Sequence, residues 1–84
     1  MTDDELLTLF TATLRDVLGD DSVALSMVTR RQDVPNWDSF AYINFIAAIE
    51  MRLKIRFAVA DVESFENVGA IVRRSQALLA DKSS

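Results

Sequence analysis

The sequence predicts an all-α protein, a four-helix bundle in which a long loop joins the first two helices and the third helix is short. Three observations predict this class. Apolar residues recur at helical spacing, residues suited to helix capping precede these segments, and the one short stretch that alternates like a β-strand has no partner strand. A chain of 84 residues, half of them hydrophobic, is expected to form a single domain, residues 1–84, with a radius of gyration of about 12 Å.

The first helix is expected at residues 3–18. Thr2 and Glu5 fit a capping box, in which the hydroxyl accepts an amide proton of the first turn and the carboxylate reaches back to the cap. Gly19 is suited to the left-handed residue that ends a helix. The apolar residues between these signals fall on one helical face: Leu6, Leu7, Phe10, Leu14, Val17 and Leu18.

Residues 20–38 lose the helical period and are expected to form a long connection. This segment contains Pro35, Asn36 and several serines and threonines, which are typical of turns and loops. Apolar residues are interspersed among them, so we expect the loop to pack onto the core rather than to remain free. These residues are Val23, Leu25, Val28, Val34 and Trp37.

The second helix is expected at residues 39–53, with Asp38 as its cap. Phe45 and Met51 fall outside its main apolar stripe, so the apolar surface is wider than one packing partner needs. The second helix is therefore either central to the core or has a second apolar contact. The main stripe, expected in the core, consists of Ile43, Ile46, Ile49 and Leu53.

The last third of the chain is expected to hold a linker and two helices. Residues 54–57 alternate but lack a partner strand, which favours an extended linker. A short third helix is expected at residues 59–65, and Asn67 is suited to cap a fourth helix at residues 68–80. Residues 81–84 are expected to fray.

The composition excludes several kinds of site. Without histidine or cysteine the chain has no imidazole base, no thiol nucleophile, no usual structural zinc site and no disulfide, so neither an enzyme nor a metal site is expected. The net charge of −4 argues against binding nucleic acid. The longest unbroken apolar run, residues 45–49, is too short for a membrane span or a signal peptide, so a cytoplasmic protein without membrane contact is expected.

The negative charge is concentrated near the N-terminus. Residues 1–29 hold six acidic side chains against a single base, Arg15. Residues 39–57, the second helix and its exit, hold one acid, Glu50, against three bases and carry a net charge of +2. Those bases are Arg52, Lys54 and Arg56.

Residues 37–40, Trp-Asp-Ser-Phe, lie where the long loop meets the second helix. A serine at a helix start is held away from the core, so another enzyme can reach the hydroxyl of Ser39. A phosphate ester on that oxygen would lie beside the free amides and the positive end of the helix dipole. For Asp38 and Ser39 taken alone, simple helix capping is the competing interpretation.

With the helical pattern, these residues resemble the acyl carrier protein family. The resemblance is carried by residues 34–40, by the apolar run of the second helix, and by residues 55, 57 and 65–69. The family attaches 4′-phosphopantetheine to the serine of an Asp-Ser-Leu motif, and freestanding bacterial carriers often show Trp-Asp-Ser. The resemblance implies the acyl-carrier type of bundle for nearly the whole chain.

The resemblance implies a function for the motif. Ser39 would carry a covalent 4′-phosphopantetheine arm, which makes the chain a phosphoprotein, and Asp38 would be recognised by the transferase that attaches the arm. Acyl intermediates of fatty acid, polyketide or other secondary metabolism would be held as thioesters on the cofactor's thiol. The implied partners of this monomer are a phosphopantetheinyl transferase and acyl-loading and acyl-transferring enzymes.

The resemblance also implies a surface for acyl chains or partners. The residues expected there are Phe40, Tyr42, Ile43, Phe45, Ile46, Met51, Val62, Phe65 and Val68. An acyl chain would lie between the isoleucines of the second helix and the residues across from them, Val62, Phe65 and Val68. For each of these residues, ordinary packing within the protein is the competing interpretation. Gly69 would permit close approach of a helix.

Three departures from the family pattern bear on function. Phe40 replaces the leucine of the motif, and the loop lacks the Gly-Gly-x-Ser pattern of peptidyl carriers, which favours an acyl cargo. The second helix has few of the acids with which fatty-acid carriers bind basic partners, so we expect partner binding to depend on apolar contact and only modestly on salt. The alternative function is an unmodified helical adaptor that binds a partner through Tyr42, Phe45 and Met51.

Overall fold

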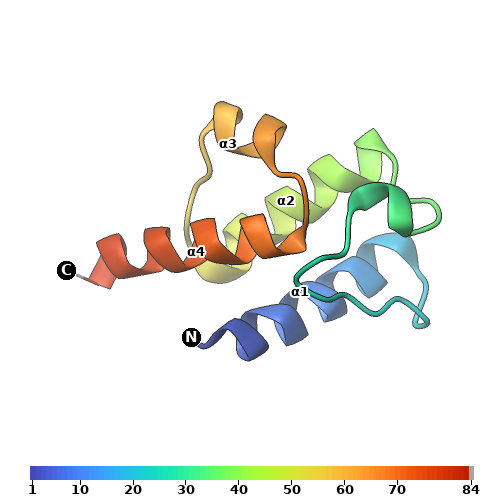
Figure 1. Ribbon diagram of the computed structural model, residues 1–84, viewed down its shortest axis with the longest axis horizontal. Coiled ribbons are helices and arrows are strands. Elements are labelled where there is room, and N and C mark those ends of the chain that lie inside the picture. The colour runs from blue at the N-terminus through green and yellow to red at the C-terminus, as the bar shows by residue number, and fades with distance from the viewer. Residues whose placement is uncertain (84) are drawn as a thin grey trace.

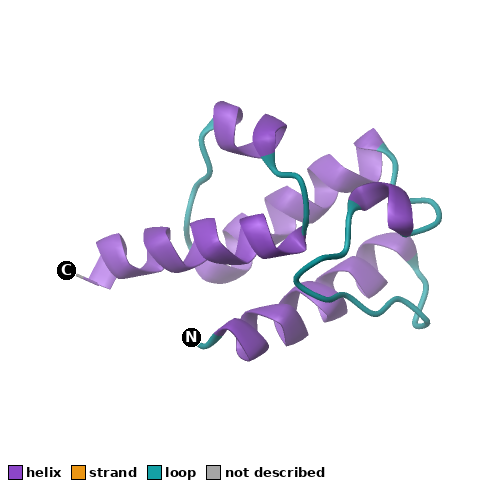
Figure 2. Ribbon diagram, in the orientation of Figure 1, coloured by secondary structure: helices purple, strands orange, loops and turns teal. Residues whose placement is uncertain are grey.

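The computed structural model describes residues 1–83 and contains four α-helices in the expected order (Figures 1 and 2). They are α1 (Asp3–Leu18), α2 (Ser39–Leu53), α3 (Val59–Ser64) and α4 (Val68–Ser83), with a 3₁₀ turn, η1 (Arg31–Asp33), in the loop between α1 and α2. No β-strand occurs in residues 1–83, so the predicted all-α class is confirmed. Within the same residues no helix is long and apolar enough to cross a membrane.

The predicted ends of α1 are confirmed in detail. The Thr2 amide donates to Glu5 Oε1 at 2.8 Å, and the Glu5 amide donates to Thr2 Oγ1 at 3.1 Å, which completes the capping box. Gly19 ends the helix in the left-handed region with φ of 64°, where its amide donates to the Arg15 carbonyl. The helix therefore begins and ends on local signals.

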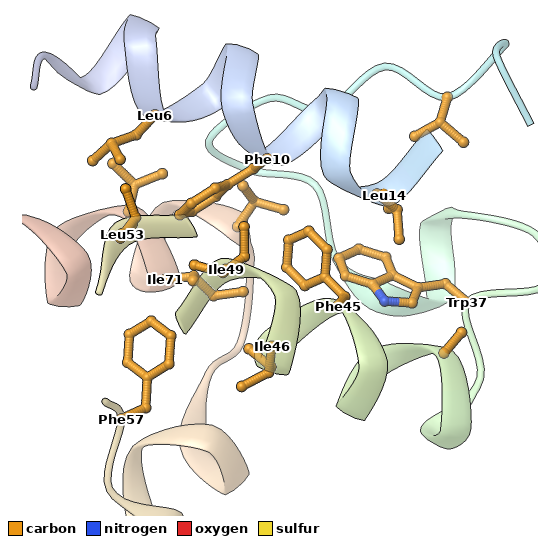
Figure 3. Close-up of a cluster of buried hydrophobic side chains, with 14 residues drawn as sticks. Leu6, Phe10, Leu14, Trp37, Phe45, Ile46, Ile49, Leu53, Phe57 and Ile71 are labelled. Carbon is orange, nitrogen blue, oxygen red and sulfur yellow. The ribbon is translucent and has the colours of Figure 1, made fainter. Parts of the chain in front are cut away.

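The core lies between α1, α2 and α4 (Figure 3). The ring of Phe10 from α1 meets the ring of Phe45 from α2 edge to face, with centroids 5.9 Å apart. Trp37 adds the end of the long loop to this cluster, because its ring centroid lies 5.2 Å from that of Phe45. The remaining core residues from the three helices are Leu6, Leu14, Ala41, Ile46, Ile49, Leu53, Val68, Ile71 and Val72.

The long connection, residues 20–38 and called loop 1 below, is pinned to the helices as expected. Val23 and Trp37 are buried, and Arg15 Nε donates to the Val23 carbonyl at 2.7 Å. Val28 is the exception, because 76% of its surface is exposed. Its neighbour Met27 packs against the core instead, so the chain turns Val28 outward at this point.

Loop 1 also contacts the first turn of α4. The amides of Val68 and Gly69 donate to the carbonyl oxygens of Thr29 and Met27 at 2.8 and 2.7 Å. A Cβ atom at Gly69 would lie 2.6 Å from the Met27 oxygen. The close approach at Gly69 is therefore to the backbone of loop 1 and not, as expected, to another helix.

The short helix α3 stands apart from α1 (Figure 1) and has no buried residue. Two polar contacts join it to its neighbours: the Tyr42 hydroxyl donates to the Val62 carbonyl at 2.8 Å, and Arg74 Nε pairs with Asp61 Oδ2 at 3.0 Å. The helix ends one residue earlier than expected because Phe65 is extended, with φ of −63° and ψ of 117°.

The helix α4 is longer than expected. Residues 81–83 continue it instead of fraying, and residue 84, for which fraying was also expected, lies outside the described residues. Lys82 Nζ donates to the carbonyl oxygen of Leu53, at the end of α2, over 3.4 Å, and this contact holds the last turn against the bundle. The Cα radius of gyration is 11.9 Å, in agreement with the size expected for this chain length.

Candidate functional site

Ser39 is the first residue of α2 and is exposed, and its position follows from the cap that precedes it. Asp38 is in the extended region, its Oδ1 accepts the Ala41 amide at 2.9 Å, and its carbonyl accepts the Tyr42 amide at 2.8 Å. The predicted cap is therefore confirmed. Among the described residues, no hydrogen bond engages the Ser39 hydroxyl, so this oxygen is accessible to a modifying enzyme.

The start of α2 offers a favourable place for an anion on Ser39. Helix geometry leaves the first amides without intrahelical acceptors, and within residues 1–83 no described acceptor takes the amides of Ser39 and Phe40. The positive end of the helix dipole lies at the same place. The Asp38 carboxylate accepts the Ala41 amide but neither of the two free donors.

The side chain of Trp37 fixes the position of the motif. Only 5% of this residue is exposed, and its ring packs against that of Phe45 (Figure 3). The ring of Tyr42 lies on another side, with its centroid 6.2 Å from that of Trp37. Asn36 precedes it in the left-handed region, with φ of 68°. The buried indole therefore anchors the chain immediately before Asp38 and Ser39, which keeps the exposed serine in a defined place.

A groove of about 440 Å³ lies between α2 and α3; we call it the α2/α3 groove. Ile43 and Ile46 line it and lie four and seven residues after Ser39, on the same face of α2. The other apolar lining residues are Ala47, Phe57, Val59 and Val62. Three charged residues, Glu50, Arg56 and Glu63, line it as well.

The structure divides the predicted acyl surface between two hollows. Ile43, Ile46 and Val62 lie together in the α2/α3 groove as expected. Phe65 and Val68 instead line a separate hollow of about 60 Å³ beside Trp37 and Tyr42. The expectation of one wall formed by Val62, Phe65 and Val68 was therefore wrong, because the extended Phe65 turns the chain between α3 and α4.

Two expectations about α2 are corrected by its orientation. Phe45 was expected at a partner surface but is fully buried, in contact with Phe10 and Trp37, and no partner can reach it. Ile43 was expected in the core but is 57% exposed. Apolar residues surround most of α2, and the side that meets α1 and α4 is centred on Phe45 and Ile49.

Three residues of the groove, Ala47, Phe57 and Val59, were not among the site residues expected from the sequence. Ala47 lies four residues after Ile43, so the helical period places it on the same face. Phe57 belongs to the extended linker, and its location depends on the path of the chain from α2 to α3. No local pattern could have placed it.

Tyr42 links three elements near Ser39. Its hydroxyl donates to Val62 of α3, and the Arg31 guanidinium of η1 lies 5.3 Å from its ring centroid. Burial raises the pKa of Tyr42 above its ordinary value, while the positive charge of Arg31 opposes this shift. Across residues 1–83, no cluster of three or more acidic side chains is arranged to hold a metal ion.

The chain is similar to a protein of known structure. The sequence matches no family model, and no curated protein matches it. The fold is similar to the solution NMR structure of a holo acyl carrier protein from Geobacter metallireducens, with a TM-score of 0.83 and 34% sequence identity. The similarity covers 90% of this chain and 87% of the other.

Proposed function

The chain belongs to the acyl carrier protein family, and from this premise we propose that it holds acyl intermediates as thioesters on a 4′-phosphopantetheine arm attached to Ser39. Its role is that of a carrier protein and not of an enzyme. The observation that carries the proposal is the exposed Ser39 hydroxyl at the start of α2, beside two free backbone amides.

The residues around Ser39 fit the proposed group. The phosphate of the arm would lie at the positive end of α2, within reach of the amides of Ser39 and Phe40. The arm supplies the thiol that forms the thioester, which the chain itself lacks because it has no cysteine. Ser39 provides the oxygen for attachment, and the helix start keeps that oxygen in solvent.

The chain's own residues would position and shelter the cargo. Asp38 caps α2 and presents its outer surface to the transferase, while the buried Trp37 holds both residues of the motif in place. The α2/α3 groove begins four residues after Ser39, and its apolar side, formed by Ile43, Ile46 and Val62, suits a hydrocarbon chain. Presentation to acyl-loading and acyl-transferring enzymes follows from the exposure of this end of the molecule.

The direct test is modification of the purified protein. Incubation with coenzyme A and a broad-specificity phosphopantetheinyl transferase should add the mass of one phosphopantetheine, measured by intact-protein mass spectrometry. Ser39→Ala should abolish the addition. Ser64→Ala, at an exposed helical serine elsewhere, should leave it unchanged. A lack of mass gain with several transferases, or a gain retained in Ser39→Ala, would contradict the proposal and favour an adaptor that never carries the arm.

A further inference from the structure

Two arginines are adjacent in the chain at the start of η1, and only one of them has an acidic partner. The amide of Arg30 donates to Asp33 Oδ2 at 2.9 Å, and Arg30 Nε lies 3.7 Å from the same oxygen. Arg30 therefore serves the turn in which it lies. Arg31 is exposed, and its guanidinium forms no ion pair with any described residue.

The guanidinium of Arg31 is held over an aromatic ring near Ser39. Its Cζ lies 5.3 Å from the ring centroid of Tyr42, and Figure 1 shows η1 beside the first turn of α2. Tyr42 follows Ser39 by three residues, and side chains of a helix lean toward its N-terminus, so the ring covers the turn that starts at Ser39. The distance of 6.2 Å between the ring centroids of Tyr42 and Trp37 agrees with this placement.

Arg31 also lines the small hollow of about 60 Å³ described above. Trp37 and Tyr42 line the same hollow, and they are the aromatic residues two positions before and three positions after Ser39. Arg31 therefore belongs to the immediate surroundings of the attachment residue, although it lies eight positions earlier in the chain.

Three carboxylates lie near Arg31 in the chain or in the hollow, and none pairs with it. Asp33 is engaged by Arg30, and Asp38 caps α2. Glu66 lines the hollow with Arg31 but forms no ion pair with any described residue. Glu66 weakens the positive potential there, yet the donors of the guanidinium have no carboxylate acceptor within the part of the chain that the structure describes.

We propose that Arg31 positions the 4′-phosphopantetheine arm by binding the phosphodiester that joins the arm to Ser39. This inference rests on the proposed function. The phosphodiester is an anion, and a planar guanidinium can donate two parallel hydrogen bonds to its oxygens. The ring of Tyr42 is the platform that keeps the guanidinium beside this turn of α2. Arg31 is thus a positioning residue, which holds the start of the arm and leaves the thiol end free.

The test compares the apo and holo forms of the same protein. Incubation with coenzyme A and a broad-specificity phosphopantetheinyl transferase is run to completion, and intact-protein mass spectrometry verifies each sample. Urea unfolding, followed by tryptophan fluorescence, then gives the ratio of the apo to the holo unfolding constant. Arg31→Ala should lower this ratio by about twofold to fivefold relative to the wild type, the range expected for an exposed ion pair. Arg31→Lys keeps the charge without the planar fork, so it should retain part of the ratio.

The matched control is Arg30→Ala, which removes the same charge from the adjacent residue. Its ratio should stay within about 1.5-fold of the wild type, because Arg30 is engaged by Asp33 in both forms. Added salt should lower the wild-type ratio and leave that of Arg31→Ala nearly unchanged. Phosphorus NMR of the holo proteins is an independent measurement: the phosphodiester resonance should move in Arg31→Ala and keep its position in Arg30→Ala.

The outcomes separate this inference from the function on which it rests. If Ser39 is fully modified and the ratio is the same for the wild type and Arg31→Ala, Arg31 serves only the ring of Tyr42, and the inference is wrong while the carrier function stands. An equal fall of the ratio in Arg30→Ala would indicate a general effect of charge and would also contradict a bound guanidinium. If Ser39 accepts no arm, the proposed function fails, and the inference fails with it.

Discussion

The amide of Gly69 donates to the carbonyl oxygen of Met27 at 2.7 Å, so the backbone of loop 1 caps the start of α4. The amide of Val68 makes the same kind of contact to Thr29, and the side chain of Asn67 accepts the amide of Ala70 at 2.8 Å. Three amides that a helix start leaves free are thus satisfied within the protein. The loop that ends at the Ser39 motif is therefore held to α4 by main-chain hydrogen bonds.

Gly69→Ala should destabilise the protein by about 1–2 kcal/mol. Alanine is the better helix former by about 1 kcal/mol, which alone would stabilise α4. The added Cβ would lie 2.6 Å from the Met27 oxygen, however, and the backbone must move apart, which weakens both hydrogen bonds to loop 1. Urea unfolding followed by fluorescence of the single tryptophan measures the change.

The control for this variant is Gly19→Ala. Gly19 has φ of 64° and no atom within 4 Å of a built Cβ, so alanine there costs about 1 kcal/mol through backbone strain alone. Amide exchange separates the two cases: only Gly69→Ala should speed exchange of the Val68 amide. A Gly69→Ala protein as stable as the wild type would show that loop 1 moves aside without cost.

Ser75→Ala should stabilise the protein by about 1 kcal/mol. Ser75 is fully buried in α4, and its hydroxyl has no hydrogen-bond partner among the described residues. Removing it relieves the cost of an unsatisfied polar group and improves helix propensity. Thermal and urea unfolding measure the gain, and an equal or lower stability would indicate that a water molecule satisfies this hydroxyl.

The matched control is Thr13→Val in α1. Thr13 is equally buried, but its hydroxyl donates to the Leu9 carbonyl at 2.7 Å and accepts from Arg52. Valine keeps the shape and removes both contacts, so the protein should lose about 1–2 kcal/mol of stability. The two substitutions should therefore change stability in opposite directions.

The starts of the helices could be predicted because their signals are local. Thr2 with Glu5, Asp38 and Asn67 each satisfy amides within three residues of themselves, so a short stretch of sequence contains both partners of the hydrogen bond. The same locality made Ser39 identifiable as an exposed residue at a helix start.

The orientation of α2 could not be predicted with the same certainty. Apolar side chains occupy most of its circumference, so the period alone did not decide between Ile43 and Phe45 for the core. The decision depends on Phe10 and Trp37, which lie far away in the sequence and meet the ring of Phe45. The contact of loop 1 with α4 could not be predicted either. Every residue has a carbonyl oxygen, and the sequence does not mark which of them accepts a hydrogen bond, as that of Met27 does.

Tyr42 should titrate at a pKa above the ordinary tyrosine value. Burial disfavours the phenolate, and Arg31→Ala should raise the pKa further, because the guanidinium favours the charged form. The chain has one tyrosine, so ultraviolet absorbance during an alkaline titration reports this group alone. A midpoint at or below that of a model peptide would contradict the burial of the phenol.

The raised pKa of Tyr42 also predicts a loss of stability in alkali. The unfolded chain ionises first, so the contribution of Tyr42 is complete below the ordinary tyrosine pKa and is lost as the pH rises through the folded value. Tyr42→Phe should remove this part of the pH dependence. At neutral pH the variant should lose about 1 kcal/mol, because the hydrogen bond to the Val62 carbonyl is absent.

Substitutions at Asp38 should separate helix capping from recognition by the transferase. Asp38→Ala removes the acceptor of the Ala41 amide and should destabilise the protein by about 1 kcal/mol, whereas Asp38→Asn, also a good cap, should change stability by only a few tenths. Both lack the carboxylate, so both should lower kcat/KM for modification of Ser39 by about tenfold or more. If Asp38→Asn is modified at the wild-type rate, the carboxylate serves the helix alone, because the neutral variant keeps the cap and differs only in charge.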